Sequence, residues 1–356
     1  MNDRFYHSKR NLPELIELEQ LISLAAKPSA SAAHIRTSVL GQIEHSIKDK
    51  SFTLPLYRLE LGSSQPQAPT LILCGGIHGI ERIGSQVILS FLRSLIQRLA
   101  WDPAIHEQLN QIRLVIYPII NPVGMWENRR CNGYGVDLMR NAPIDALGKP
   151  AFLVGGHRIS RHLPWYRGKK DRAMQREAQL LTDDIAATIK GQKHCISLDC
   201  HSGFGHRDRI WFPYARSKTP WPNIANAMKL TQQFETTYPS HDFYLFEPQA
   251  NSYTTHGDLW DYMYDEGMRA NKGMNFIPLT LEMGSWLWLK KSPSNLFNYS
   301  SFFNPILPHR QTRILRRHLT LFEFLLSAVR SMPNWSQNQS SELYHQALNR
   351  WYQSKA

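Results

Sequence analysis

His78 and Glu81 stand three residues apart in a loop that follows an apolar stretch and two glycines. An imidazole and a carboxylate are both good zinc ligands, and a catalytic zinc keeps one coordination position open for water. The chain has 15 histidines, so about one His-x-x-Glu pair is expected by chance at ordinary glutamate frequency. The pair therefore indicates a metal site only if further ligands can be found.

Two further polar side chains lie near the ends of apolar stretches later in the chain. His201 follows the residues 195–200, and Glu282 lies within the stretch 276–284. Taken singly, His201 could be a buried histidine bonded to the backbone, and Glu282 could be the partner of an arginine. Taken together, two histidines and two glutamates suit a His-His-carboxylate zinc site with a separate general base.

A loop rich in Gly, Asn and Arg, residues 121–142, carries the next candidates. Its arginines Arg129, Arg130 and Arg140 keep their charge and present forked donors, which suit a substrate carboxylate or an oxyanion. Asp137 could orient a ligating histidine by accepting its second N–H. The alternative for the arginines is ordinary ion pairing at the surface.

The elements that must position these residues alternate along the chain. We expect strands where apolar runs or apolar alternation occur, at 54–62, 70–74, 111–121, 194–201, 210–215 and 275–285. We expect helices where apolar residues recur at helical spacing, at 11–26, 84–100, 171–190, 221–238 and 310–332. This alternation predicts a three-layer α/β/α fold with a mixed, mostly parallel twisted sheet. The polar clusters then lie at the carboxyl ends of strands, where open α/β sheets place their sites.

No break in composition requires two large domains. We expect an N-terminal helical segment and linker at 1–53, a catalytic domain at 54–332 and a C-terminal tail at 333–356. No apolar run reaches 18 residues, so no transmembrane helix is expected, and the polar start of the chain lacks the apolar core of a signal peptide. Four scattered cysteines without a C-x-x-C pair favour a reduced, cytoplasmic setting.

The net charge of +12 is spread along the chain, with short clusters at 167–172 and 313–318. Neither cluster is interleaved with aromatic residues as a base-stacking surface would be, so a solvated basic surface is the simpler interpretation. We expect no nucleic-acid partner and no membrane partner. The sequence predicts no oligomeric state.

Five segments together resemble the zinc carboxypeptidase family, the funnelin-type metallopeptidases. The family pattern combines a His-x-x-Glu pair, an Asn-Pro-x-Gly turn, an arginine-rich loop, a third ligand histidine and a glutamate on a late strand. In this chain the segments are HGIE (78–81), NPVG (121–124), RCNGYGVDLMRN (130–141), DCHSG (199–203) and LTLEMG (279–284). The resemblance extends over roughly residues 55 to 330, and it implies the α/β/α fold of that family.

The resemblance also implies the chemistry. It makes His78, Glu81 and His201 the ligands of one zinc ion per chain, and Glu282 the general base that later returns the proton. Arg130 matches the arginine that polarises the scissile carbonyl and stabilises the oxyanion. The implied activity is hydrolysis of a peptide or amide bond by metal-activated water.

Further positions carry over to residues that orient a metal ligand or bind the substrate. Asp137 matches the carboxylate that orients the first histidine, and Arg140 matches the arginine that receives a terminal carboxylate. The mobile tyrosine of the family is best matched by Tyr253, with Tyr262 and Tyr264 as alternatives.

Met139 departs from the family pattern, which has an asparagine before the second arginine. Methionine offers no donor, so carboxylate recognition would have to come from Asn141 or Arg129. A related branch, the aspartoacylase and succinylglutamate desuccinylase group, cleaves N-acyl amino acids at a similar zinc site. The sequence therefore leaves two substrates open, a peptide or an acylated amino acid. A non-catalytic basic binding protein is the remaining alternative, and the intact set of ligands and base argues against it.

Overall fold

An eight-stranded mixed sheet forms the centre of the molecule. The computed structural model describes residues 12–26, 35–47, 50–286, 299–336 and 341–353. The strand order is β1-β2-β4-β3-β5-β8-β6-β7. The strands are β1 (Ile35–Ile47), β2 (Lys50–Gly62), β3 (Thr70–Gly75), β4 (Arg113–Tyr117), β5 (His194–Ser202), β6 (Asp208–Phe212), β7 (Tyr244–Pro248) and β8 (Asn275–Met283).

The four central strands, β4, β3, β5 and β8, run parallel to one another. They are the strands with nearly continuous apolar sequences, and every residue of β3 is buried. Such runs are typical of strands that are covered on both faces. Antiparallel pairs flank this centre, because β2 pairs with β4 on one side and β6 pairs with β8 on the other.

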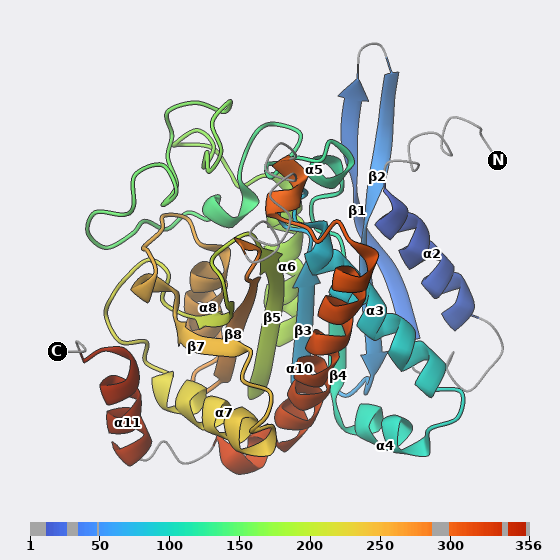
Figure 1. Cartoon of the computed structure of the whole chain (residues 1–356), viewed down its shortest axis with the longest axis vertical. Helices are drawn as coiled ribbons and strands as arrows, with labels where there is room; N and C mark the ends of the chain where they lie inside the picture. The colour runs from blue at the N-terminus through green and yellow to red at the C-terminus, as the bar shows by residue number, and fades with distance from the viewer. Residues whose placement is uncertain (1–11, 27–34, 48–49, 287–298, 337–340, 354–356) are drawn as a thin grey trace.

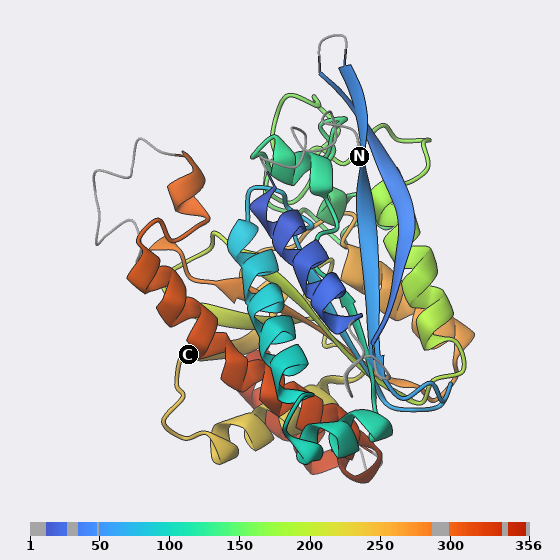
Figure 2. The same ribbon diagram turned by 90° about the vertical axis from the view of Figure 1, so that its right-hand side faces the viewer.

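Helices cover both faces of the sheet (Figures 1 and 2). Helices α2, α3, α7 and α10 lie on one face, and α6 and α8 lie on the other. The predicted three-layer α/β/α arrangement is thereby confirmed. The helices are α2 (Pro13–Ala25), α3 (Arg82–Arg98), α4 (Pro103–Gln111), α5 (Pro122–Trp126), α6 (Arg176–Ile189), α7 (Ile224–Thr237), α8 (Leu259–Ala270), α10 (Pro308–Trp335) and α11 (Ser341–Trp351). Short 3-10 turns are η2 (Leu138–Arg140), η3 (Gln249–Asn251) and η5 (Tyr299–Phe302).

The N-terminal part of the chain is more regular than the sequence indicated. Residues 35–47 and 50–53 were expected to belong to the N-terminal helical segment and linker, but they form β1 and the first residues of β2, and β1 joins the sheet. The boundary expected at residue 54 therefore falls inside a strand. The expected linker at 27–34 lies outside the described residues. Strand β1 lacks a clear apolar alternation because it is an edge strand, and Ile43 is its buried hydrophobic residue.

The C-terminal part also contains regular structure. Helix α10 continues through Pro333 to Trp335, and α11 packs against α7 within the segment that was expected to be a tail. Helices α4 and α8 and strand β7 were not expected from the sequence. Among the described helices, none is both long and apolar enough to cross a membrane.

Candidate metal centre and catalytic pocket

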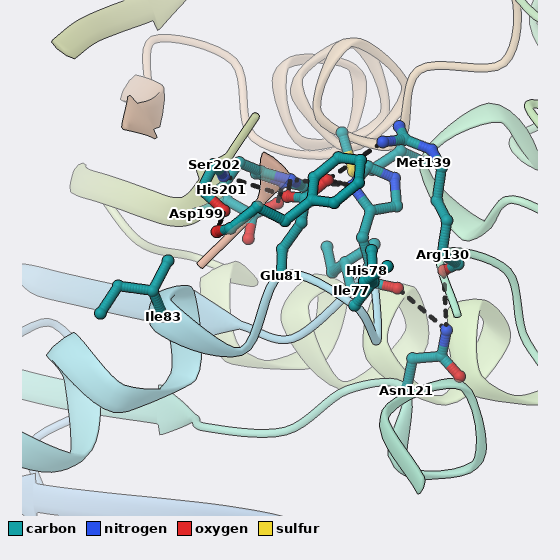
Figure 3. A network of polar contacts seen from close by, with 12 residues as sticks. Ile77, His78, Glu81, Ile83, Asn121, Arg130, Met139, Asp199, His201 and Ser202 are labelled. Carbon is teal, nitrogen blue, oxygen red and sulfur yellow. Dashed lines mark hydrogen bonds and ion pairs between the residues drawn. The ribbon is translucent and has the colours of Figure 1, made fainter. Parts of the chain in front are cut away.

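The loop that carries His78 and Glu81 leaves the end of β3 and is held by a second loop. The Asn121 side-chain amide donates to the carbonyls of Ile77, at 3.1 Å, and Arg130, at 3.3 Å (Figure 3). The Asn121 side-chain oxygen also accepts the backbone N–H of Gly124 at 2.9 Å, which caps α5. Asn121 therefore connects the loop that carries the metal ligands to the loop that carries Arg130.

Glycine is required where these two loops meet. A Cβ atom on Gly79 would lie 2.0 Å from the backbone carbon of Gly124. No side chain can be accommodated at that separation, so the loops approach as closely as they do only because position 79 has none. This contact explains a glycine inside the His-x-x-Glu segment.

The structure brings His78, Glu81 and His201 together. The two Nδ1 atoms of the histidines lie 3.1 Å apart. His78 Nδ1 lies 2.9 Å from Glu81 Oε1, and His201 Nδ1 lies 3.0 Å from Glu81 Oε2. All three side chains are buried, and one ligand atom from each lies within 4.8 Å of the others. The two Nδ1 atoms and the Glu81 carboxylate oxygens thus converge on one point at the carboxyl ends of β3 and β5.

The outer nitrogen of each ring is held by a different carboxylate. His78 Nε2 donates to Asp137 Oδ1 at 3.0 Å, and His201 Nε2 donates to Asp199 Oδ2 at 2.7 Å. Trp260 Nε1 donates to the same Asp199 oxygen at 2.9 Å. With the proton fixed on Nε2 by an acceptor, a neutral ring presents the lone pair of Nδ1 to the centre.

This donor set fits zinc. Two imidazole nitrogens and a carboxylate are the protein ligands of a common class of catalytic zinc sites, and a carboxylate behind each histidine is the usual outer support. Asp199 was noted in the sequence only as part of a polar cluster. Its role could have been found from strand geometry, because residues two apart in a strand lie on the same face.

Glu282 lines a cavity of about 230 Å³ together with the three ligand candidates. It lies on β8, where it pairs in register with His201 of β5. Burial and the neighbouring Glu81 carboxylate raise the pKa of Glu282 to about 8, against the opposing effects of His201 and Arg130. A carboxyl group in this environment can both hold and release a proton near neutral pH.

Arg130 reaches into the same cavity. Its guanidinium donates from Nε to Asp137 Oδ2 at 2.8 Å and from Nη1 to Glu81 Oε1 at 3.0 Å. Burial opposes the charged form, yet Asp137 and Glu81 outweigh it and raise the pKa of Arg130 above its usual value. The arginine is therefore a fixed cation beside the metal ligands.

Arg140 and Tyr253 form a second polar group on the cavity wall. Arg140 Nη2 donates to the Tyr253 hydroxyl at 3.5 Å. Burial raises the pKa of Tyr253, so its hydroxyl keeps its proton. Gly257 brings the tyrosine segment against the arginine: its φ is +67°, and a Cβ there would lie 2.0 Å from the Arg140 carbonyl oxygen.

Four other residues named from the sequence lie elsewhere. Asn141 does not line the cavity, because its side chain bonds the backbone of Arg167 and Gln175, at 2.9 and 2.6 Å. Arg129 is also absent from the lining, and its Nε lies 2.5 Å from Glu127. The two alternative tyrosines lie outside the cavity as well, Tyr262 in a different cavity and Tyr264 in the core.

The remaining wall of the cavity is largely apolar. Met139 lies there, 4% exposed, at the position where the family pattern has an asparagine. Phe303 also lines the cavity, and its carbonyl oxygen accepts the hydroxyl of Ser202 at 2.6 Å. The sequence carried no signal for Phe303, because only the fold brings the segment before α10 beside β5. The other apolar wall residues are Val154, Pro164, Trp165, Phe204 and Trp211.

Comparisons with known proteins agree with this geometry. The sequence model of the zinc carboxypeptidase family matches residues 40–286. Carboxypeptidase E of Caenorhabditis elegans is 26% identical over 149 residues, which span 38% of this chain and 32% of that protein. The match thus spans about a third of the length of that curated relative.

Solved structures share the fold. Carboxypeptidase A from Helicoverpa armigera is similar with a TM-score of 0.63 at 18% identity, over 89% of this chain and 72% of that one. Bovine thrombin-activatable fibrinolysis inhibitor, solved with a tick carboxypeptidase inhibitor, is similar with a TM-score of 0.62 at 18% identity. The match covers 91% of this chain and 98% of that one. The family model matches more than half of this chain. The chain therefore belongs to the zinc carboxypeptidase family and is a zinc metallopeptidase-like hydrolase.

Proposed function

We propose that this chain hydrolyses the bond that precedes the carboxyl-terminal residue of a peptide. The observation that carries the proposal is the composition of one cavity, which holds the metal-ligand set, a buried carboxyl group and two arginines. His78, Glu81 and His201 would hold a zinc ion, which would act as a Lewis acid that lowers the pKa of a water molecule and polarises a carbonyl. The residues of the chain supply the rest.

Glu282 moves the proton. Its carboxylate takes the proton from the attacking water and returns it to the nitrogen of the leaving amine. Its place on β8, in register with His201 on β5, keeps it beside the metal ligands without being one of them. Strands hold a side chain more precisely than loops do, which suits a group that must transfer a proton twice.

Arg130 stabilises the negative charge that develops on the carbonyl oxygen. Asp137 holds Nε of this guanidinium, and that bond orients the group before the substrate arrives. A preorganised donor of this kind is worth about 10²–10³ in rate. Because Asp137 also accepts from His78, one carboxylate aligns both the cation and a metal ligand.

Arg140 and Tyr253 bind the terminal carboxylate in this proposal. Arginine presents two parallel donors that match a carboxylate, and the tyrosine hydroxyl adds another. Arg140 is 3% exposed and its Nη2 donates to the Tyr253 hydroxyl, so the pair is preformed. The apolar wall then receives the side chain of the terminal residue.

A second candidate is hydrolysis of an N-acyl amino acid on the same site. Met139 bears on both candidates, because it places a thioether where a family asparagine would offer a donor to the carboxylate that both substrates carry. Asn141 does not compensate, since its amide is engaged with the backbone. The acyl group would then lie where the rest of a peptide lies in the first candidate.

A substrate panel on the zinc-loaded protein separates the two candidates. The panel contains N-blocked peptides with a free carboxyl terminus, the same peptides as carboxyl-terminal amides, and N-acyl amino acids. We expect cleavage of the free-carboxylate peptides, with kcat/KM at least about tenfold lower for the amides because the charge-assisted contact to Arg140 is lost. Cleavage of the N-acyl amino acids alone would establish the second candidate, and no cleavage of any member would reject both.

A further inference from the structure

A second cavity, of about 370 Å³, opens at the same edge of the sheet as the catalytic pocket. Its walls come from the start of β6, the start of β7, the residue Gly284 after β8 and the first turns of α10. Gly284 stands two residues after Glu282. We call this cavity the arginine groove, because Arg207, Arg310, Arg313 and Arg317 line it.

The charge of the arginine groove is predominantly positive. The four arginines face two aspartates, and Asp208 is already engaged by the backbone N–H of Gly284 and by Arg317, both at 2.9 Å. Arg317 also lies over the ring of Phe243, with its guanidinium carbon 4.2 Å from the ring centre. The second aspartate, Asp242, shares the groove with the other three arginines, and its backbone carbonyl accepts from Arg207 at 2.9 Å.

Ion pairing accounts for part of this charge, because Arg317 donates to Asp208 at 2.9 Å. Arg310 and Arg313 lie in the first two turns of α10, whose first turn contains no acidic residue. The amino-terminal end of a helix carries partial positive charge in its first turn, which adds to the positive potential around Arg310. Arg313 and Arg207 are exposed to solvent. The groove therefore presents positive charge at the surface, which favours the binding of anions.

Aromatic residues connect the arginine groove to the catalytic pocket. Phe204 lines the pocket and His206 lines the groove, so the two walls are at most about 7 Å apart along the chain. Trp286 stands between them, with its ring centre 6.0 Å from that of Phe204 and 5.3 Å from that of His206. Trp286 is 45% exposed, which makes it a surface over which a peptide chain can lie.

We propose that the arginine groove binds acidic side chains of a peptide substrate, on the amino-terminal side of the bond that is cut. This inference rests on the proposed function, in which Arg140 holds the terminal carboxylate and the rest of the peptide leaves the pocket. Arg140 does not line the groove, so the two sites can be occupied by different parts of one peptide. Arginine, with its planar fork of donors, suits carboxylates better than lysine does.

The test compares two N-blocked peptides that differ only by Glu or Gln at the three positions before the scissile bond. We expect the zinc-loaded protein to prefer the Glu peptide by about tenfold in kcat/KM at low salt, because charge-assisted hydrogen bonds are stronger than neutral ones. High salt should reduce the preference. Arg313→Glu should abolish it, with a larger fall in kcat/KM for the Glu peptide than for the Gln peptide.

Arg330→Glu is the matched control. It makes the same change of charge on the same helix, about 25 Å from Arg313 at the usual rise per residue, and Arg330 is exposed and does not line the groove. This variant should keep the wild-type preference. Equal kcat/KM for the two peptides, or a preference that survives Arg313→Glu, would overturn the proposal.

Fluorescence polarisation with labelled versions of the same peptides measures binding without cleavage, so it distinguishes failure of the proposed hydrolysis from failure of the groove. If neither peptide is cleaved, yet the Glu peptide binds more tightly and Arg313→Glu removes the difference, the groove stands and the proposed hydrolysis fails. If both peptides are cleaved and bind equally well, the proposed hydrolysis stands and the groove fails.

Discussion

At the scale of single residues, the site depends on pairs in which one side chain fixes another. Asp199 holds the outer nitrogen of His201 and is itself held by Trp260. Asp137 holds His78 and Arg130 at once. The ring nitrogens that face the centre are therefore set by groups behind them, and the ligand residues alone do not define the site.

Asp199→Asn tests this support. The amide keeps the size of the carboxylate but loses its charge, so His201 becomes a weaker and less firmly oriented ligand. We expect zinc affinity to fall by about 10- to 100-fold, measured by competition with a chelator of known affinity. Asp183→Asn, on the exposed side of α6, is the control and should bind zinc as the wild type does. Unchanged affinity in Asp199→Asn would contradict the assignment.

Met139→Asn tests the carboxylate site. The change restores a donor at the cavity wall, and one neutral hydrogen bond contributes about 1 kcal/mol, or roughly fivefold in kcat/KM for peptides with a free carboxyl terminus. Met139→Leu keeps the volume without the donor and should have little effect. A gain of the same size in both variants would show that packing, and not the donor, limits the reaction.

At the scale of elements, two loops must meet for Arg140 to face the cavity. Gly257 allows this contact, because its backbone lies against the Arg140 carbonyl and its φ is +67°. The backbone N–H of Ala142 donates to the Gly257 carbonyl at 3.0 Å. The tyrosine-bearing segment and the arginine-bearing turn η2 are therefore positioned together.

Gly257→Ala should lower both stability and kcat/KM, with Gly273→Ala as its matched control. Both positions have positive φ, at +67° and +82°, so both variants lose about 1–2 kcal/mol from backbone strain. Only at position 257 does the new Cβ meet another backbone, since nothing lies within 4 Å of it at position 273. Equal urea midpoints and equal kcat/KM for the two variants would contradict the argument.

At the scale of the whole molecule, the hairpin β1–β2 is joined to the sheet by charge as well as by backbone pairing. Glu60 of β2 lies 2.7 Å from Arg36 of β1, 2.5 Å from Arg58 of β2 and 2.9 Å from Arg113 of β4. Burial opposes the charged carboxylate, but the three arginines outweigh it and lower the pKa of Glu60 to about 2. The N-terminal region is in this way part of the same folded body as the site.

This cluster predicts how stability depends on pH. The folded pKa lies below the ordinary value of 4.5, so the native state binds fewer protons and the stabilisation is present above that value and lost as the pH falls toward 2. Glu60→Gln should lower the urea midpoint at about pH 7, and the difference from wild type should shrink toward about pH 3.5. Glu44→Gln, on the exposed side of β1, is the control. A difference that stays constant with pH would contradict the prediction.

The sequence predicted the centre of the fold better than its edges, for a physical reason. Strands β3, β5 and β8 are covered on both faces, so their residues are almost uniformly apolar and easily recognised. Edge strands β1 and β7 show no such run. The spatial convergence of His78 and His201 could be predicted because His78 follows β3 and His201 lies at the carboxyl end of the neighbouring β5. The contacts of Asn141 and Phe303 could not, because they depend on loops that only tertiary packing brings together.

The most direct test of the central claim is to measure zinc content and hydrolysis in Glu282→Gln, with His201→Ala beside it. Glu282 is assigned as the base and not as a ligand, so Glu282→Gln should keep one zinc per chain and lose about 10²–10⁴-fold in kcat/KM on any substrate that the wild type cleaves. His201→Ala should lose the zinc. Full activity in Glu282→Gln, or loss of its zinc, would contradict the account.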